Sequence, residues 1–392
     1  MHIMGSMTTG RAVLAAALAL AALVFADQAT TDAFVGAAPN GSLLLRPAAG
    51  QQVLVDGVAF QSLLARVARL EQQACRLETD TTSISGLGQE EKWSGGVLAG
   101  NGKIYGLPWG SQSVLILDPS THTVDTTTIT GLVGVAKWHG GVLAGNGKIY
   151  GIPHEATQVL VIDPSTNTID LGLSGLVGGG KWFGGVLAGN GKIYGIPWFS
   201  EAVLIIDPVN NTTDITTMTG LSGNSKWSGG VLAANGKIYC IPHNTAPVLI
   251  IDPAINQYDI TSIVDAPGGA KYADGVLAGN GLIYAVPFHA TAVMIIDPAT
   301  NTVDKTTITG LGGDAKWMGG VLGSSGRIYG IPWRSQSVLI IDPLANTADT
   351  TTLTGNLTGD LKWWDGVAAD GKIFGIPRLA TSILVIQCTN TV

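Results

Sequence analysis

Charged side chains are scarce in this sequence, and so are cysteine and histidine. Only 12 % of the 392 residues are charged, and the formal net charge is −7. This balance argues against a nucleic-acid partner, because nucleic-acid-binding proteins present a basic face. Three cysteines are few for a secreted, disulfide-held scaffold. The hydrophobic fraction of 46 % instead allows a large buried core.

Motifs for catalysis and metal binding are also missing. The six histidines show no His-Glu-x-x-His spacing, and the chain has no Gly-x-Ser-x-Gly elbow and no phosphate-binding loop. The acids of the repeated Asp-Pro pairs, such as Asp118, come singly, which gives a calcium site little support. We therefore assign no catalytic residue, no metal ligand and no cofactor from the sequence.

What the sequence has is a repeat of about 45 residues in seven copies. The first copy begins with residues 92–109, Lys-Trp-Ser-Gly-Gly-Val-Leu-Ala-Gly-Asn-Gly-Lys-Ile-Tyr-Gly-Leu-Pro-Trp. The copies start at Lys92, Lys137, Lys181, Lys226, Lys271, Lys316 and Lys362. Repeats of this length are typical of propellers and other repeat architectures.

Each copy predicts four antiparallel strands. In the first copy these are residues 96–99, 103–108, 113–117 and 123–130, and Asn101-Gly102 is a strong hairpin signal between the first two. Four strands per repeat of this length describe a propeller blade. The fold class is therefore all-β, a seven-bladed β-propeller over residues 79–392.

The last copy lacks a fourth strand, because the chain ends at Val392. Residues 80–87, before the first copy, are similar in sequence to residues 125–132. We expect this N-terminal stretch to complete the last blade and close the ring, which removes an exposed sheet edge.

The repeat register also places Cys75 and Cys388 at one turn of the closing blade. In an oxidising compartment this predicts a disulfide, with a loop-closure contribution of roughly 5 kcal/mol at most. Unlinked thiols, or a bridge from Cys75 to another chain, are the alternatives. Cys240 is expected to be a buried free thiol.

The N-terminal region differs from the repeats. Residues 1–26, with an apolar run after Arg11, are typical of a secretory signal peptide, which leaves no transmembrane span in the mature chain; a retained signal anchor is the alternative. Residues 27–59 form a lead in which residues 43–45 and 53–55 are candidate short strands.

Residues 60–78 show the 3-4 apolar spacing of a helix, about two and a half heptads long. A helix this short must pack on something. We interpret it as a coiled-coil neck that makes the molecule a homo-oligomer, with a trimer favoured; the alternative is an amphipathic helix that lies on its own propeller.

Secretion would make Asn-x-Ser/Thr triplets available for glycosylation. Four asparagines stand in such triplets: Asn40, Asn210, Asn211 and Asn356.

The seven copies differ mainly at two places, which propeller connectivity puts on one face. The Asn-Gly and Asp-Pro-x-x-Asn corners hardly vary, and we call their side the corner face; the opposite side is the variable face. Variation in Trp, His, Phe and Arg on a fixed scaffold predicts ligand binding. The predicted ligand-binding residues are Trp109, His139, His154, Trp198, His243, Phe288, Trp333 and Arg378.

The lysines that start the copies also belong to the variable face. As a ring of like charge at the channel mouth they would attract an anionic or sugar ligand. The structural alternative is that the neighbouring aromatic rings wedge between blades and that each lysine stem covers a ring.

The variable face also allows a catalytic interpretation. Three of its histidines, His139, His154 and His243, can share it with carboxylates. The candidate acids are Asp274, Asp365 and Glu155.

Residues 114–124 and 203–213 resemble the Val-x-Val-Ile-Asp-x-x-Thr-Asn-x-Val phrase of YVTN-type surface-layer propellers, and Gly-Lys-Ile-Tyr is loosely similar to kelch-type propellers. The resemblance covers residues 80–392. It implies an extracellular or cell-surface binding or structural module. Some seven-bladed relatives are lyases, but none of their catalytic motifs can be matched here residue by residue.

Together these observations predict a secreted, non-enzymatic propeller that acts as a structural or recognition subunit of an extracellular or cell-surface assembly. Its expected partners are itself and other extracellular proteins or glycans. The alternatives are a secreted hydrolase or lyase with its site on the variable face, and a lectin that uses Trp109, Trp198 and Trp333.

Overall fold

The computed structural model describes residues 75–390 except 89, 266 and 267, and four short strands before them. Those strands pair as two antiparallel hairpins, β1 (Phe34–Ala37) with β2 (Leu43–Arg46) and β3 (Leu54–Val55) with β4 (Val58–Ala59). Both stretches expected to be short strands in the lead thus contain one, β2 and β3. The predicted signal peptide, the neck through residue 74 and Asn40 lie outside the described residues.

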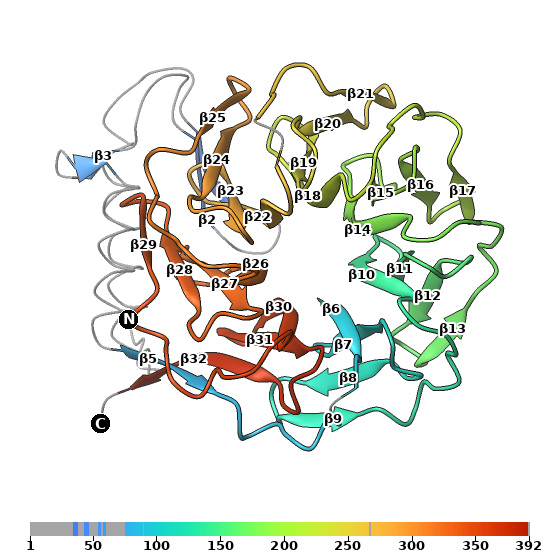
Figure 1. The fold of residues 1–392 in the computed structure, drawn as a ribbon, viewed down its shortest axis with the longest axis horizontal. Helices are drawn as coiled ribbons and strands as arrows, with labels where there is room; N and C mark the ends of the chain where they lie inside the picture. The colour runs from blue at the N-terminus through green and yellow to red at the C-terminus, as the bar shows by residue number, and fades with distance from the viewer. Residues whose placement is uncertain are drawn as a thin grey trace. The chain divides into compact units, whose positions relative to one another are not determined.

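Residues 77–387 form one compact unit, a seven-bladed β-propeller of four-stranded sheets arranged around a central axis (Figure 1). This confirms the predicted fold class. The innermost strands are β6 (Trp93–Leu98), β10 (Trp138–Leu143), β14 (Trp182–Leu187), β18 (Trp227–Leu232), β22 (Tyr272–Leu277), β26 (Trp317–Leu322) and β30 (Trp363–Ala369). The second strands are β7 (Ile104–Pro108), β11 (Ile149–Pro153), β15 (Ile193–Pro197), β19 (Ile238–Pro242), β23 (Ile283–Pro287), β27 (Ile328–Pro332) and β31 (Lys372–Pro377).

In blades 1 to 6 the third and fourth strands are shorter than the first two. The third strands are β8 (Leu115–Asp118), β12 (Leu160–Asp163), β16 (Leu204–Asp207), β20 (Leu249–Asp252), β24 (Met294–Asp297), β28 (Leu339–Asp342) and β32 (Leu384–Asn390). The fourth strands are β9 (Thr123–Asp125), β13 (Thr168–Asp170), β17 (Thr212–Asp214), β21 (Gln257–Asp259), β25 (Thr302–Asp304), β29 (Thr347–Asp349) and β5 (Cys75–Asp80). Blade 1 is β6 to β9, and blade 7 is β30, β31, β32 and β5.

The fourth strands end five residues earlier than the sequence predicts. In blade 1 the carboxylate of Asp125 accepts hydrogen bonds from the backbone N–H groups of Thr127 (2.7 Å) and Thr128 (3.1 Å). These bonds turn the chain out of the ladder, as Asp side chains commonly do at turns. Asp125 therefore ends the strand, although the Thr-rich sequence continues to Thr130.

An N-terminal strand completes blade 7, as expected, but it is formed by residues 75–80 and not by residues 80–87. β5 ends at Asp80, whose carboxylate accepts from Thr82 N (2.7 Å) and Ser83 N (3.1 Å) in the same way as Asp125. Beside β32, the amide of Gln387 donates to Glu78 Oε1 (3.2 Å). Residues 81–87 are therefore the connection to blade 1, and the pairing residues are those from 75 to 80.

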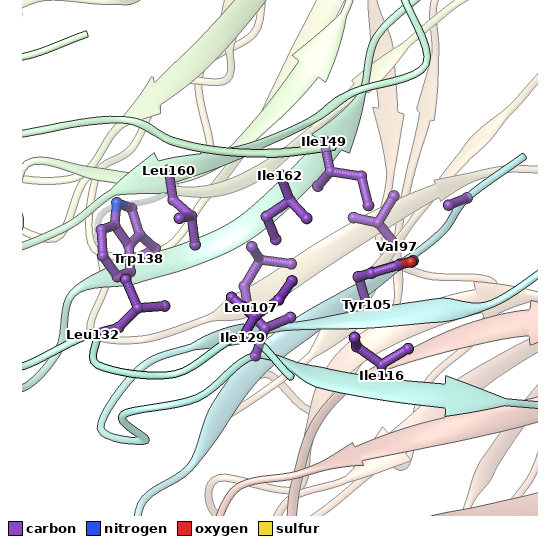
Figure 2. Close-up of a cluster of buried hydrophobic side chains, with 12 residues drawn as sticks. Val97, Tyr105, Leu107, Ile116, Ile129, Leu132, Trp138, Ile149, Leu160 and Ile162 are labelled. Carbon is purple, nitrogen blue, oxygen red and sulfur yellow. The ribbon is translucent and has the colours of Figure 1, made fainter. Parts of the chain in front are cut away.

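The hydrophobic core lies between neighbouring blades. In Figure 2, Leu107 and Ile129 of blade 1 meet Trp138, Leu160 and Ile162 of blade 2 in one buried cluster. Equivalent clusters fill the other interfaces. Each contact surface is apolar on both sides, so each blade is stabilised by its two neighbours.

The corner face carries a repeated polar contact between blades. Tyr105 OH donates to Asn167 Oδ1 of blade 2 (2.7 Å), and Asn101 Nδ2 donates to the carbonyl of Pro164 (2.9 Å). Asn167 has a positive φ of 54°, a conformation that Asn adopts more readily than most residues. The same Tyr–Asn bond is formed between blades 3 and 4, 4 and 5, and 5 and 6, so these corners hold one another across four of the interfaces.

Blade 7 meets blade 1 through different residues. Phe374 stands where the other blades have Tyr, and His122 stands where the facing turn has Asn. Their rings make an edge contact with centroids 6.0 Å apart, and His122 Nε2 lies 3.0 Å from Lys372 Nζ. Both partners of the polar pair have been exchanged together at this interface, which we call the closing interface.

Candidate functional site

The lysines that begin the blades have backbone partners. Six of them are 2–6 % exposed, and Lys271 is half-buried. Lys137 Nζ, for example, donates to the carbonyls of Ser111 (2.8 Å), Gly134 (2.7 Å) and Trp109 (3.2 Å), two of which belong to the preceding blade. Burial lowers the pKa of Lys137 to about 8, so the ammonium form still predominates at neutral pH.

These contacts make the lysines links between blades. The same donation to the preceding blade is made by Lys92, Lys181, Lys226, Lys271, Lys316 and Lys362. Three ammonium groups also lie 5.7–6.0 Å from the tryptophan ring that follows them: those of Lys181, Lys226 and Lys316. The packing of Trp138 against blade 1 agrees with the structural alternative, whereas the hydrogen bonds from the ammonium groups to carbonyl oxygens were expected by neither interpretation.

The variable face gathers its aromatic side chains into one cluster around the channel mouth. We call it the aromatic cluster; its members are Trp109, His139, His154, Phe183, Trp198, His243, Phe288, Trp333 and Trp364, with Arg378 against them. All eight predicted ligand-binding residues are included. Phe183 and Trp364 were not among those eight, yet they hold the two halves of the cluster together.

One half of the cluster runs over blades 2 to 5. His139 stacks on Phe183 with ring centroids 3.3 Å apart, and Phe183 stacks on Trp198 at 4.5 Å. His243 lies between Trp198 (4.8 Å) and Phe288 (5.9 Å). The rings therefore form a continuous row that links four blades.

The other half is organised by Arg378. Its guanidinium lies 4.3 Å from the ring centroid of Trp364 and 4.8 Å from that of Trp333. Nη2 pairs with Glu91 Oε1 (2.5 Å), and Trp109 Nε1 donates to Glu91 Oε2 (3.1 Å). Glu91 thus joins the start of blade 1 to Arg378 of blade 7.

Exposure is unequal across the cluster. Trp109 and Trp333 are 9 % and 4 % exposed, so their ring faces are used in packing. Trp198 and Phe288 are partly exposed, and the adjacent Phe199 is 42 % exposed and stacked on Trp198. Blades 3 and 5 thus present the accessible rings, which we call the exposed aromatic row: Trp198, Phe199, Phe288 and His289.

The buried histidines are neutral. His154 Nδ1 lies 3.2 Å from the carbonyl oxygen of Trp182, and His243 Nδ1 lies 2.7 Å from that of Tyr272. Because a carbonyl only accepts, Nδ1 carries the proton in both rings. Burial lowers the pKa of His243 to about 4 and also lowers the pKa of His154.

Next to the cluster lies a cavity of about 210 Å³, lined by residues from all seven innermost strands, which we call the axial cavity. His139, Trp364, Asp274 and Asp365 all line it. Glu155 does not; its Oε1 accepts from Gly180 N at 2.8 Å. The structure therefore brings one of the three candidate histidines together with two of the three candidate acids.

Enclosure changes the acidity of the two aspartates. Burial raises the pKa of Asp365 to about 6. Burial, and then the charge of Asp365, raise the pKa of Asp274 well above its ordinary value. The described residues contain no group of three or more His, Cys, Asp or Glu side chains placed to hold a metal ion.

The remaining predicted sites are on the surface or only partly described. Asn210, Asn211 and Asn356 are exposed. Cys240 is a buried free thiol, as expected, and Cys388 is disulfide-bonded. The side chain of Cys75 lies outside the described residues, so its pairing with Cys388 stays a prediction.

Comparison with solved structures identifies the same fold in several proteins. A streptogramin B lyase superposes with a TM-score of 0.63 at 12 % identity over 80 % of this chain and 98 % of the lyase. A catalytically inactive virginiamycin B lyase from Staphylococcus aureus, with quinupristin, gives 0.65 at 11 % over 80 % and 99 %. The extracellular domain of a hybrid two-component system from B. thetaiotaomicron gives 0.57 at 8 % over 77 % and 40 %.

At these identities the likeness shows the seven-bladed fold alone. No protein-family model matches the sequence, and neither does any curated protein. Among the described residues, no helix has the length and apolar character needed to cross a membrane.

Proposed function

We propose that this chain is a secreted, non-enzymatic propeller that serves as a recognition subunit of an extracellular or cell-surface assembly. The observation that carries the proposal is the exposed aromatic row. It lies on a rigid ring whose corner face is uniform, and it combines flat rings with polar edges, which are frequent in recognition surfaces. Similar folds in extracellular domains are consistent with this location.

The row is suited to stacking against sugar rings or the side chains of a partner protein. Trp198 and Phe199 are nearly parallel, with an interplanar angle of 15°, and Phe288 meets His289 edge-on at 4.8 Å. Their neighbours in the cluster are buried, so the exposed rings keep one orientation. A fixed orientation lowers the entropy cost of binding.

A glycan array tests the proposal. The protein is compared with Trp198→Ala/Phe288→Ala, and Ile255→Ser on the corner face is the control, because Ile255 is also exposed, at 61 %. We expect at least one glycan class to bind, with a loss of tenfold or more in the double variant and none in the control.

Light scattering tests the assembly. The mature chain is compared with a chain that starts at residue 75, which keeps the strand that completes blade 7. An oligomer that becomes a monomer on truncation would support an assembly role for residues 27–74. Monomers in both cases, together with no glycan binding, would contradict the proposal.

A second candidate is a lyase or hydrolase that works at the axial cavity. It is favoured by the neutral His139 beside two carboxyl groups, the types of group that perform acid–base catalysis. Turnover of a substrate by the native protein, abolished in His139→Asn with the melting temperature retained, would establish it.

A further inference from the structure

The axial cavity breaks the repeat symmetry of the propeller. The innermost strands carry a Gly-Gly pair in five blades, but blades 5 and 7 have Asp274-Gly and Asp365-Gly. A Cβ built on Gly229 or Gly319 would collide with the carboxylate of Asp274 or Asp365, respectively, so the glycines of blades 4 and 6 make room for these acids. Since five blades form with glycine, the fold itself does not require the two carboxylates.

The two acids accept few hydrogen bonds for carboxyl groups in a cavity. Asp274 accepts from Gly275 N at 2.8 Å and also from the backbone N–H of Gly320, and Asp365 accepts from Gly366 N at 2.7 Å. Among the described residues neither carboxylate forms an ion pair with Lys, Arg or His. A partly buried carboxylate without a cation is unfavourable, so the pair has the character of a cation site.

Two side chains that line the same cavity have buried polar atoms without a partner. Neither ring nitrogen of His139, one a donor and the other an acceptor in the neutral ring, has a hydrogen-bond partner, and neither does Nε1 of Trp364. These side chains are 9 % and 5 % exposed. Buried polar groups are almost always satisfied in folded proteins, so these orphaned atoms indicate a missing acceptor.

We propose that the axial cavity binds a small α-amino acid, with its ammonium group at Asp274 and Asp365 and its carboxylate at the indole N–H of Trp364 and an N–H of His139. One zwitterion supplies a cation to the acids and an acceptor to the two N–H groups. A metal ion would leave the indole N–H unpaired, and water alone would supply no positive charge to the carboxylate of Asp365. Phe183 and Met318 also line the cavity and supply apolar surface for a short carbon skeleton. This site is separate from the exposed aromatic row and does not depend on the proposed function.

Isothermal titration calorimetry of the full mature chain at pH 7.5 tests the assignment. The ligands are the proteinogenic α-amino acids, each compared with its N-acetyl form, which lacks the ammonium group, and with the corresponding amine, which lacks the carboxylate. We expect at least one amino acid to bind, and both of its analogues to bind at least tenfold more weakly.

The matched variant is Asp274→Gly/Asp365→Gly, because it gives blades 5 and 7 the residue that the other blades already carry. It should keep the fold and lose affinity by at least tenfold, whereas Ile255→Ser on the corner face should bind like the native protein. If the glycine variant does not fold, Asp274→Asn/Asp365→Asn preserves the shape of both side chains and removes their charge.

Three outcomes would overturn the assignment. The first is that no amino acid binds, and the second is that the aspartate variants bind as tightly as the native protein. The third is that calcium or magnesium chloride alone binds at one site that the variants lose, which would make the cavity a metal site. Loss of glycan binding or of assembly would leave the result unchanged, because those properties concern other surfaces.

Discussion

The ammonium group of Lys92 donates a hydrogen bond of 2.9 Å to the carbonyl oxygen of Arg378, 286 residues further along the chain. It also donates to the carbonyl of Gly88 at 2.7 Å, so one side chain holds the entry to blade 1 against blade 7. The six other lysines repeat this contact between consecutive blades. At the closing interface it joins the two ends of the propeller.

Lys92→Met is expected to lower the free energy of unfolding by about 2 kcal/mol or more, because it leaves buried carbonyls without their charged donor. The control is Lys148→Met, because the Lys148 side chain is 44 % exposed and its ammonium group lies 3.8 Å from Asp163 Oδ2. An exposed pair of this kind contributes at most about 1 kcal/mol. Urea unfolding measures both; equal losses would contradict the role assigned to the lysines.

The exchanged pair at the closing interface predicts coupling between Phe374 and His122. His122→Asn removes the ring contact, and adding Phe374→Tyr restores the Tyr–Asn hydrogen bond found at other interfaces. His122 already has a φ of 57°, which Asn tolerates. A double-mutant cycle should therefore give a favourable coupling of about 1 kcal/mol. Additive effects would show that the two positions vary independently.

Asp365 should make the protein less stable as the pH rises. Its pKa is raised to about 6 in the folded state, from an ordinary value of 3.8. Its stabilising contribution is therefore complete below pH 3.8 and is lost as the pH rises through 6, by linkage up to roughly 3 kcal/mol. Asp365→Asn removes this loss, so the variant should melt higher than the native protein at pH 8, with a smaller difference at pH 4.5.

Asp304 serves as a control, because the pKa of its carboxyl group is shifted in the opposite direction. Hydrogen bonds from the side chain of Thr307 and the backbone of Thr306 lower its pKa to about 2. Its contribution is present above the ordinary pKa and is lost as the pH falls toward 2. Asp304→Asn should therefore lower the melting temperature by a constant amount between pH 5 and 8. A pH-independent effect of Asp365→Asn over the same range would contradict the account of the axial cavity.

The expected Cys75–Cys388 bridge predicts a redox-dependent melting temperature. Peptide mapping without reduction should recover the two cysteines in one linked fragment, and Cys388→Ser should lower the melting temperature to that of the reduced protein. Cys240 should not react with a thiol reagent until the protein unfolds, because it is fully buried and burial raises its pKa. Rapid labelling of Cys240 in the native protein would contradict its place in the core.

The repeat made the fold predictable, since seven near-identical copies allow few other architectures. The strand ends were not predictable in the same way, because the turn at Asp125 depends on which backbone N–H groups its carboxylate reaches. The partners of the lysines could not be read from the sequence either, since an ammonium group at a channel mouth can face solvent or a carbonyl. The acids of the axial cavity could be recognised in the sequence, because Asp274 and Asp365 stand where the other five copies have glycine.

Near-identical blades carry a hazard during folding, because a strand or a whole blade can dock in a neighbour's place or in another molecule. Phe374 and His122 fit one another but do not reproduce the Tyr–Asn contact with any other blade. Arg378 and Glu91 add an ion pair, and no other copy of the repeat has Glu before its first lysine or Arg at the position of Arg378. The closing interface therefore distinguishes the first and last blades from the other five. In a ring with too few or too many blades, or in one formed by two chains, these residues would not meet their partners.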